Sequence, residues 1–501
     1  WIETVFVIGC LLSLLTMNFV NVNYDLTKYL PETAESAIGL DVMRDKFGYP
    51  GTARVMVKDV SLYEAKQYKD EIADIDGVDQ VLWCDSTVNI YAGEDFIDES
   101  EIKDYYKDRN AVYDITFVEE SDSTRTSTAI DEIKDLLGDK GCYVGMAVQN
   151  KSMTESMASE MSKILVVAVI MIFAVLSVTT TAWTEPILFL LVMGVAVLLN
   201  KGTNIFIGTV SFLTENVSII LQLATSMDYS IFLWHSYQEQ IDRYDGDKKR
   251  AMAHAISHTI VSVTGSSITT IAGFVALCFM SFTLGLDLGI VMAKGVVFGV
   301  IGCVTILPAL ILACDKAIEK TKHKILMPDV SRIASWVTNH YKILAVIFIV
   351  VLIPAIYGYT HDQVYYDLAG TMPDSAYSKQ ANERLDKEYA MGATHIIIAP
   401  SDMSKADSIS MIDDIKKVDG VKLAVSLDSI LGPTIPDDMV PDEAKEIFKN
   451  GDYQMMLVSS KYATASDEVN NQITEIKKIV KNYSEDAMLI GEAPCTKDLI
   501  T

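Results

Sequence analysis

Seven long apolar runs alternate with polar segments along the chain, and this alternation limits the possible folds more than any other sequence feature. The runs lie at about 3–21, 162–182, 186–200, 212–235, 259–281, 289–313 and 342–359. A helix of about 20 apolar residues crosses the hydrocarbon core of a bilayer. The sequence therefore predicts a polytopic α-helical membrane protein with seven spans.

The acidic residues are concentrated in two polar blocks between these runs. Of the 67 Asp and Glu residues in the 501-residue chain, 30 lie in 23–160 and 25 in 361–501, and the net charge is -26. We expect each block to form a large water-facing domain. Nucleic acid is excluded as a partner, because binding it relies on clustered Lys and Arg.

The distribution of Lys and Arg predicts the orientation. The short segments 235–258 and 314–342 hold ten basic residues, whereas the short loops 201–211 and 282–288 hold only Lys201. By the positive-inside rule the basic segments are cytoplasmic and both acidic domains are extracytoplasmic, in the plasma membrane. The first run lacks the basic start and small-residue end of a cleaved signal peptide, so we expect a retained anchor.

An internal repeat relates the two acidic blocks. NYDLTKYLPETAESAIGLDVMRDKFGYPGT from Asn23 aligns without gaps to YYDLAGTMPDSAYSKQANERLDKEYAMGAT from Tyr365, and shorter matches follow to the end of each block. Each copy follows one span and has the predicted order strand, helix, strand, strand, helix, strand. This βαββαβ order suits two α/β ferredoxin-like domains. The second copy ends where a further span would begin, so we expect an internal duplication with its second half truncated.

The predicted domains follow from these boundaries. They are the first span (1–22), the first extracytoplasmic porter-like domain (23–160), the five-span bundle (161–314), a cytoplasmic linker (315–341), the seventh span (342–360) and the second extracytoplasmic porter-like domain (361–501). The segment 235–258 mixes charged and apolar residues, and we interpret it as an interfacial helix on the inner surface.

The fourth run, VSIILQLATSMDYSIFLW, contains Asp228 followed by Tyr229. An ionisable side chain at membrane depth costs at least ~2.5 kcal/mol, so by default it marks an ion path. Ser218, Gln222 and Thr225 share one narrow helical stripe with Tyr229, which we expect to face the bundle interior, and Asp228 flanks this stripe. The alternative is that Asp228 is a neutral, hydrogen-bonded packing residue.

Other polar residues in the spans are candidates for supporting a proton relay. Thr225 and Ser226 lie beside Asp228, while Ser266 belongs to the small-residue face TIVSVTGSSITTIAGF of the fifth run, which we interpret first as a helix-packing face. Lys294 in the sixth run lies near its outer end and can reach toward the interface, so a structural role and a functional one both stay open. Gly295, Gly299 and Gly302 form a predicted packing face.

The sequence contains no paired nucleophile and base, no Walker-type loop and no metal-ligand spacing, so we expect no catalytic residues, no metal and no cofactor.

Four local sequences together resemble the MMPL branch of the RND superfamily. They are the YDLTKYLP stretch, SMDYSIFL of the fourth run, SSITTIAGF of the fifth, and MAKGVVFGVIGCVTILPALIL of the sixth. The five-span bundle also resembles a sterol-sensing domain. The resemblance implies a secondary active transporter in which Asp228 and Tyr229 form a proton relay with a matching pair in a tenth span, which this chain does not contain.

The resulting hypothesis is a proton-driven exporter of lipids or other hydrophobic compounds, with the proton gradient as its energy source. Membrane lipids and a hydrophobic substrate are the expected partners, and homo-oligomerisation stays open. A sterol- or lipid-sensing protein that does not pump and an auxiliary of protein secretion similar to SecDF are the alternatives. A second acid in the tenth span would favour transport over sensing.

Overall fold

The computed structural model describes residues 2–86, 102, 105–324, 331–361, 393–432, 445, 448–462 and 466–500. The chain divides into two compact units, of which unit 1 comprises 1–23 and 159–364, and unit 2 comprises 24–158 and 365–501. Unit 1 holds the apolar helices and unit 2 holds both acidic blocks. The first part of the second repeat copy, 365–392, lies outside the described residues.

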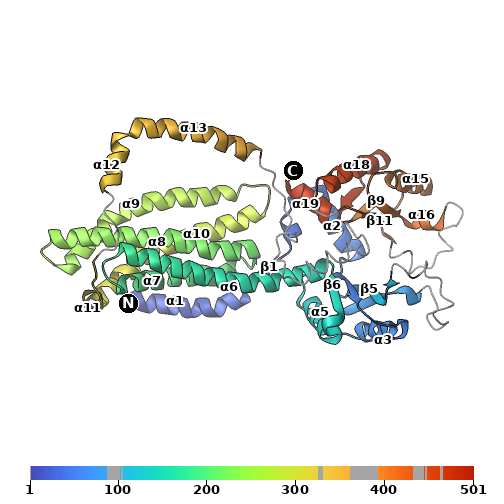
Figure 1. The fold of residues 1–501 in the computed structure, drawn as a ribbon, viewed down its shortest axis with the longest axis horizontal. Coiled ribbons are helices and arrows are strands. Elements are labelled where there is room, and N and C mark those ends of the chain that lie inside the picture. Colours follow the sequence, from blue (N-terminus) through green and yellow to red (C-terminus); the bar gives the residue numbers. More distant parts are fainter. Residues whose placement is uncertain are drawn as a thin grey trace. The chain divides into compact units, whose positions relative to one another are not determined.

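Unit 1 consists of long, roughly parallel helices (Figure 1), of which the last, α13 (Tyr341–Thr360), buries no residue against the others. Six described helices are long and apolar enough to cross a membrane, and the first predicted span is a shorter apolar helix. Their bounds are α1 (Ile2–Thr16), α6 (Met146–Thr179), α7 (Thr184–Gly202), α8 (Phe212–Arg243), α9 (Lys248–Leu277), α10 (Leu284–Ala313) and α13 (Tyr341–Thr360). The predicted helical membrane architecture is confirmed.

Helices α7, α8 and α10 form the centre of the bundle. In each of them 44% of the most apolar window is buried, compared with 11% in α6 and α9. The predicted glycine face of α10 explains the close packing, because a Cβ at Gly295 would lie 2.8 Å from Asn200 Nδ2, and one at Gly299 would lie 2.5 Å from Ser226 Oγ. Small residues let membrane helices approach closely. The packing face predicted for Gly295, Gly299 and Gly302 is confirmed.

The interfacial helix predicted for 235–258 is wrong. The first part of this segment extends α8 to Arg243 and the last part begins α9 at Lys248. A turn separates them, with positive φ at Asp245 and Gly246. The apolar residues that suggested an amphipathic surface helix belong to the bundle core. The Asp-Gly pair was the signal for a turn.

The two ends of the bundle are closed by short elements. At one end β1 (Asn21–Asn23) pairs in parallel with β7 (Thr209–Ser211). The short helix η8 (Thr203–Phe206) precedes β7 in the chain. At the other end α11 (Asp315–Lys320) follows α10, and Lys248 donates to Asp315 Oδ2 at 2.6 Å. The helix α12 (Ser331–Asn339) precedes α13 and buries no residue.

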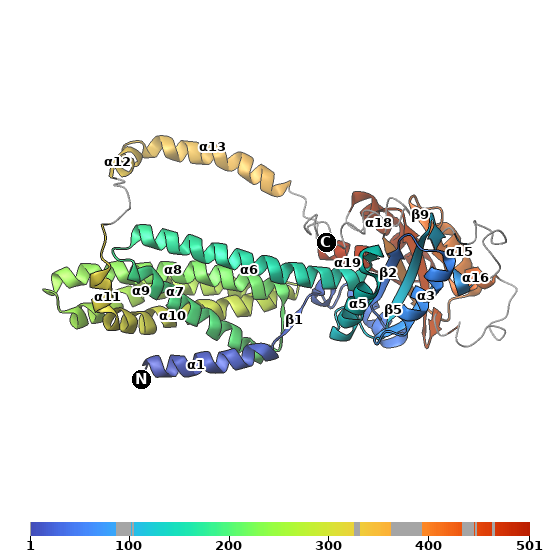
Figure 2. The same ribbon diagram turned by 60° about the horizontal axis from the view of Figure 1, so that its bottom comes forward.

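Unit 2 contains two sheets with the same strand order, and helices pack against each of them (Figure 2). The first has the order β3-β5-β2-β6 with β4 (Tyr106–Lys107) at its side, and the second has β9-β11-β8-β12 with β10 (Lys449–Asn450) at its side. The segment of the first sheet comprises β2 (Thr52–Val57), α3 (Leu62–Ala73), β3 (Val78–Leu82), β5 (Asn110–Phe117), α5 (Thr124–Leu137) and β6 (Gly141–Val144). The second comprises β8 (Thr394–Pro400), α15 (Lys405–Ile415), β9 (Val421–Val425), α16 (Leu427–Leu431), β11 (Tyr453–Ser460), α18 (Asp467–Tyr483), β12 (Met488–Ile490) and α19 (Glu492–Ile500).

The helix α2 (Glu35–Val42) precedes the first sheet in the chain but packs on the second sheet. Its Leu40 is buried in one apolar cluster with Ile398 and Ile490. Glu35 Oε1 accepts a hydrogen bond from the Leu489 backbone N–H at 3.1 Å. The sequence pattern does not predict this contact, which joins the two acidic blocks into one unit.

Replacing Gly39 by leucine is expected to destabilise unit 2. A Cβ at Gly39 would clash with Ile490 and lie 3.3 Å from Met488 Cβ. Overpacking of this kind typically costs about 1–3 kcal/mol. The midpoint of thermal unfolding of the purified protein in detergent measures the effect. Ile38→Leu is the control, because Ile38 is 46% exposed and should tolerate the change. Equal midpoints for the two variants would contradict the packing of α2.

Candidate functional site

The polar stripe predicted on the fourth run lies on α8 and faces the inside of the bundle. Ser218, Gln222 and Tyr229 are 3%, 4% and 6% exposed, and Thr225 is half-buried. Tyr229 belongs to the apolar core cluster, and its backbone carbonyl accepts a hydrogen bond from Cys303 Sγ on α10 at 3.2 Å. The predicted direction of this stripe is confirmed.

Asp228 lies on a different side of α8 from Tyr229. Its side chain is exposed in a strip of α8 that also contains Val217, Ala224 and Phe232. Consecutive residues of a helix point about 100° apart, so the two neighbours face different surroundings. Within the described residues, Asp228 has no hydrogen-bond or ion-pair partner. An apolar helix strip with one carboxylate is costly in lipid, so this face requires a polar or aqueous neighbour.

Ser226 and Ser266, which the sequence offered as relay support, occupy very different positions. Ser226 is 4% exposed, and its Oγ faces the backbone of α10 at Gly299 without a hydrogen-bond partner. Ser266 is exposed on α9. The structure therefore places Ser226 inside the bundle and Ser266 on its surface.

The small-residue face of α9 does not pack against another helix of the described bundle. Ser262, Ser266 and Thr269 are exposed, and a Cβ at Gly265 or Gly273 would meet nothing within 4 Å. Within the described residues this face has no helix partner, and its interpretation as a packing surface stays a prediction. The side of α9 that packs on α8 and α10 carries Thr259, Val263 and Ser267 instead.

Lys294 of α10 forms hydrogen bonds at the C-terminal end of α7. Its Nζ donates to the Asn200 backbone carbonyl at 3.0 Å and to Asn204 Oδ1 at 2.6 Å. A cation that satisfies the last carbonyls of a helix also interacts favourably with the helix dipole. Lys294 thus reaches toward the end of the bundle at β1 and β7, as expected, and it binds both a backbone carbonyl of α7 and the side chain of Asn204 in η8.

Sequence reasoning missed a buried amide pair beside Lys294. Asn200 Nδ2 on α7 donates to Gln222 Oε1 on α8 at 2.9 Å, and Asn200 is 2% exposed. The second amide atoms, Asn200 Oδ1 and Gln222 Nε2, have no partner. The available signal in the sequence was Asn200, a single amide residue at the end of the apolar run 186–200.

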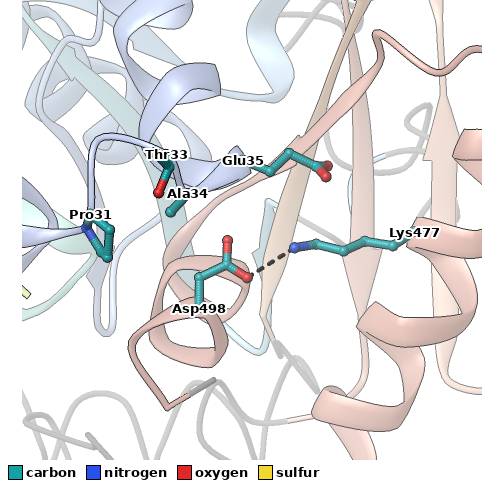
Figure 3. Close-up of a pocket in the computed structure, with 6 residues that line it drawn as sticks. All are labelled: Pro31, Thr33, Ala34, Glu35, Lys477 and Asp498. Atoms are coloured by element: carbon teal, nitrogen blue, oxygen red, sulfur yellow. Dashed lines mark hydrogen bonds and ion pairs between the residues drawn. The ribbon is translucent and has the colours of Figure 1, made fainter. Parts of the chain in front are cut away.

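Unit 2 has an open pocket of about 260 Å³ at the start of α2 (Figure 3). Lys477 Nζ and Asp498 Oδ1 are 3.0 Å apart across it, and Asp498 Oδ2 accepts from the Ser36 backbone N–H at 3.3 Å. Glu35 pairs with Lys481 at 3.4 Å nearby. These charged groups hold the start of α2 against α18 and α19.

Within the described residues, no group of three His, Cys, Asp or Glu side chains is arranged to hold a metal ion. All seven cysteines are free. Burial raises the pKa of the Cys84 thiol to about 11, so this thiol is protonated and unreactive at neutral pH.

A family model for the MMPL family matches residues 30–340, which is more than half of the chain. The chain belongs to the MMPL family. The resemblance seen in four short motifs thus extends from the first acidic block through the five-span bundle. The protein is a multi-pass membrane protein, as its apolar helices indicate.

Three curated relatives of this MMPL chain match over parts of their length. "Putative membrane protein ActII-3" of Streptomyces coelicolor is 27% identical over 189 residues, 36% of this chain and 26% of that protein. "Probable transport protein MmpL2" of Mycobacterium tuberculosis is 23% identical over 222 residues, 41% and 22% respectively. "Putative membrane protein MJ1562" of Methanocaldococcus jannaschii is 34% identical over 98 residues, 20% and 25%. The chain spans about a quarter of the length of these relatives.

Proposed function

We propose that this MMPL chain is part of a proton-driven secondary transporter that exports lipids or other hydrophobic compounds across the plasma membrane. The observation that carries the proposal is Asp228, an unpartnered carboxylate on an otherwise apolar, exposed strip of α8. Membership of the MMPL family and a relative named as a probable transport protein support a transporter.

In this mechanism Asp228 binds a proton that enters from outside and releases it inside. Protonation removes the charge, and the exposed strip of α8 then becomes compatible with an apolar neighbour. Deprotonation restores the charge, and the strip then again requires a polar or aqueous neighbour. A ligand shifts a conformational equilibrium only through its different affinity for the two states, and the proton at Asp228 supplies that difference. Tyr229, buried against α10, would hold α8 in position.

We further propose that unit 2 is extracytoplasmic and consists of two copies of a ferredoxin-like domain. The shared strand order and the repeat from Asn23 and Tyr365 support the duplication. The basic residues of 243–250 and 316–342 support a cytoplasmic location for the end of the bundle that carries the turn between α8 and α9. The substrate route would involve unit 2, with membrane lipids as the source of the substrate.

Export is tested with inverted membrane vesicles from cells that produce the intact protein. An inside-acid pH gradient should drive accumulation of a fluorescent long-chain lipid analogue, and a protonophore should stop it. Vesicles from cells that lack the protein give the background. Accumulation that persists after the gradient is collapsed would contradict proton coupling.

A further inference from the structure

The short helix α12 (Ser331–Asn339) has an apolar face and a polar face. Ile333, Trp336 and Val337 are spaced by three and four residues, so they lie on one side of the helix. The opposite side carries uncharged polar side chains, which belong to Ser331, Ser335, Thr338 and Asn339. This pattern is typical of a helix that lies at the boundary between an apolar phase and water.

The apolar face of α12 is uncovered within the described part of the chain. Ile333, Trp336 and Val337 are 63%, 55% and 43% exposed, and no residue of α12 is buried. A helix of nine residues is only marginally stable in water by itself, because forming its first turn is costly. The apolar face therefore requires an apolar neighbour.

The connection to α13 determines which neighbour is available. Helix α12 ends one residue before α13, which has 20 residues and is long and apolar enough to cross a membrane. The intervening His340 donates its backbone N–H to the Trp336 carbonyl at 3.0 Å, and its own carbonyl accepts from the Leu344 N–H at 3.0 Å. Figure 1 and Figure 2 both show α12 turned away from the direction of α13. A membrane-spanning α13 thus places α12 directly at the membrane surface.

Aromatic and basic side chains gather at the junction of α12 and α13. Trp336 and Tyr341 are exposed, and such side chains are enriched where a membrane meets water. Arg332 and Lys342 are exposed too, and the Lys342 ammonium lies 5.8 Å from the centre of the Tyr341 ring. Residues 331–361 contain no Asp or Glu, although the net charge of the chain is -26. The charge of this junction is therefore complementary to anionic lipid headgroups.

We propose that α12 binds the surface of a bilayer that contains anionic phospholipids. Its apolar face enters the boundary between headgroups and acyl chains. The Arg332 guanidinium donates two hydrogen bonds to one headgroup phosphate, and the Lys342 ammonium pairs with another as a point charge. In this way α12 fixes the depth at which α13 starts. The proposal goes beyond the proposed function, because it holds for a transporter and for a sensor alike.

Quenching of tryptophan fluorescence by brominated lipids tests where α12 lies. The intact protein and its Trp336→Phe variant are reconstituted into nanodiscs of ordinary phospholipids, or of phospholipids brominated near the glycerol end of their acyl chains. The difference in emission between the two proteins is the Trp336 contribution, and brominated lipids should reduce it by about half or more. An equal Trp336 contribution in the two lipids would overturn the proposal and show that protein or water covers this face.

The matched control for this measurement is Trp83→Phe. Trp83 is 1% exposed in the core of unit 2, so its contribution to the emission should be the same in both lipids. Trp336 is exposed, and its replacement by phenylalanine should leave folding unchanged.

A comparison of headgroups tests the two basic residues. A small fraction of brominated lipid, either phosphatidylglycerol or phosphatidylcholine, is added to nanodiscs of unbrominated phosphatidylcholine. One basic side chain near a membrane surface enriches anionic lipid about fivefold, so brominated phosphatidylglycerol should quench Trp336 several times more strongly. Arg332→Gln combined with Lys342→Gln should remove this preference and keep the quenching by brominated phosphatidylcholine, since the apolar face is intact.

Lys163→Gln is the matched control for the double variant. It removes a lysine of α6 whose side chain is 66% exposed, and the preference for phosphatidylglycerol should persist. Equal quenching by the two lipids in the wild-type protein would overturn the assignment of Arg332 and Lys342 to anionic headgroups. The same preference in the wild-type protein and the double variant would overturn it too.

Discussion

Replacing Asp228 by asparagine is expected to reduce proton-driven transport to the background of vesicles that lack the protein. Asparagine has nearly the same size and still forms hydrogen bonds, but it cannot alternate between a charged and a neutral state. The change should therefore remove proton coupling without disturbing insertion or folding. Accumulation of the fluorescent lipid analogue in inverted vesicles under an imposed pH gradient measures the loss.

Two further variants make the Asp228 result specific. Phe232→Leu changes the same exposed strip of α8 about one turn away, and it should transport at nearly the wild-type rate. Asp228→Glu keeps a titratable group and should retain transport that still depends on the pH gradient. Full transport by Asp228→Asn would show that the carboxylate is a packing residue.

Acidification is expected to destabilise unit 2 through His395. This histidine is 0% exposed on β8, and burial lowers its pKa to about 4, although its Nε2 lies 3.3 Å from Gln472 Oε1. Between pH 6.5 and 4 the unfolded chain binds a proton that the folded chain excludes. The free energy of unfolding should therefore fall as the pH falls through this window, by up to ~3 kcal/mol.

The His395 contribution is measured by comparing unfolding midpoints of the purified protein and a variant between pH 7 and pH 4. His395→Leu removes the titration and should flatten the pH dependence within this window, and His395→Gln serves if the leucine variant folds poorly. The equivalent position in the first copy is Ala53, which is also buried and does not titrate. The same pH dependence in wild type and both variants would contradict this assignment.

The sequence predicted most of the helical bundle, because long apolar runs have few alternatives to crossing a membrane. The glycine face of α10 was also predictable, since Gly295, Gly299 and Gly302 recur at helical spacing. The turn at Asp245 and Gly246 was missed because the apolar residues around it fit an amphipathic helix as well as two helix ends. Local pattern alone did not decide between these two structures.

Other features depend on contacts between distant segments, which local sequence patterns do not encode. The packing of α2 on the second sheet follows from the fit of Gly39 against Ile490, residues that are far apart in the chain. Whether the small residues around Ser266 face a helix or the surface depends on which neighbours are present. The Asn200–Gln222 pair also required the α7–α8 packing to be known.

For the candidate site, the sequence placed Asp228 and the polar stripe of α8 correctly on one helix. It placed Asp228 beside the stripe that carries Tyr229, but it did not predict that the Asp228 side chain would be exposed, because the family resemblance implied a joint role for the two residues. The difference follows from the 100° rotation between neighbouring residues combined with the position of α10. Lys294 was recognised as a charge near the end of its span, while its bond to Asn200 required the tertiary structure.

Proton coupling of export is the central claim, and one comparison in inverted vesicles tests it most directly. The uptake of several fluorescent hydrophobic probes is followed with an inside-acid gradient and after its collapse by a protonophore, in wild type and Asp228→Asn. The account predicts that at least one probe accumulates, and that both the protonophore and the substitution abolish its accumulation. Equal probe uptake with and without the gradient, and in wild type and Asp228→Asn, would contradict the account and favour a lipid-binding or sensing protein.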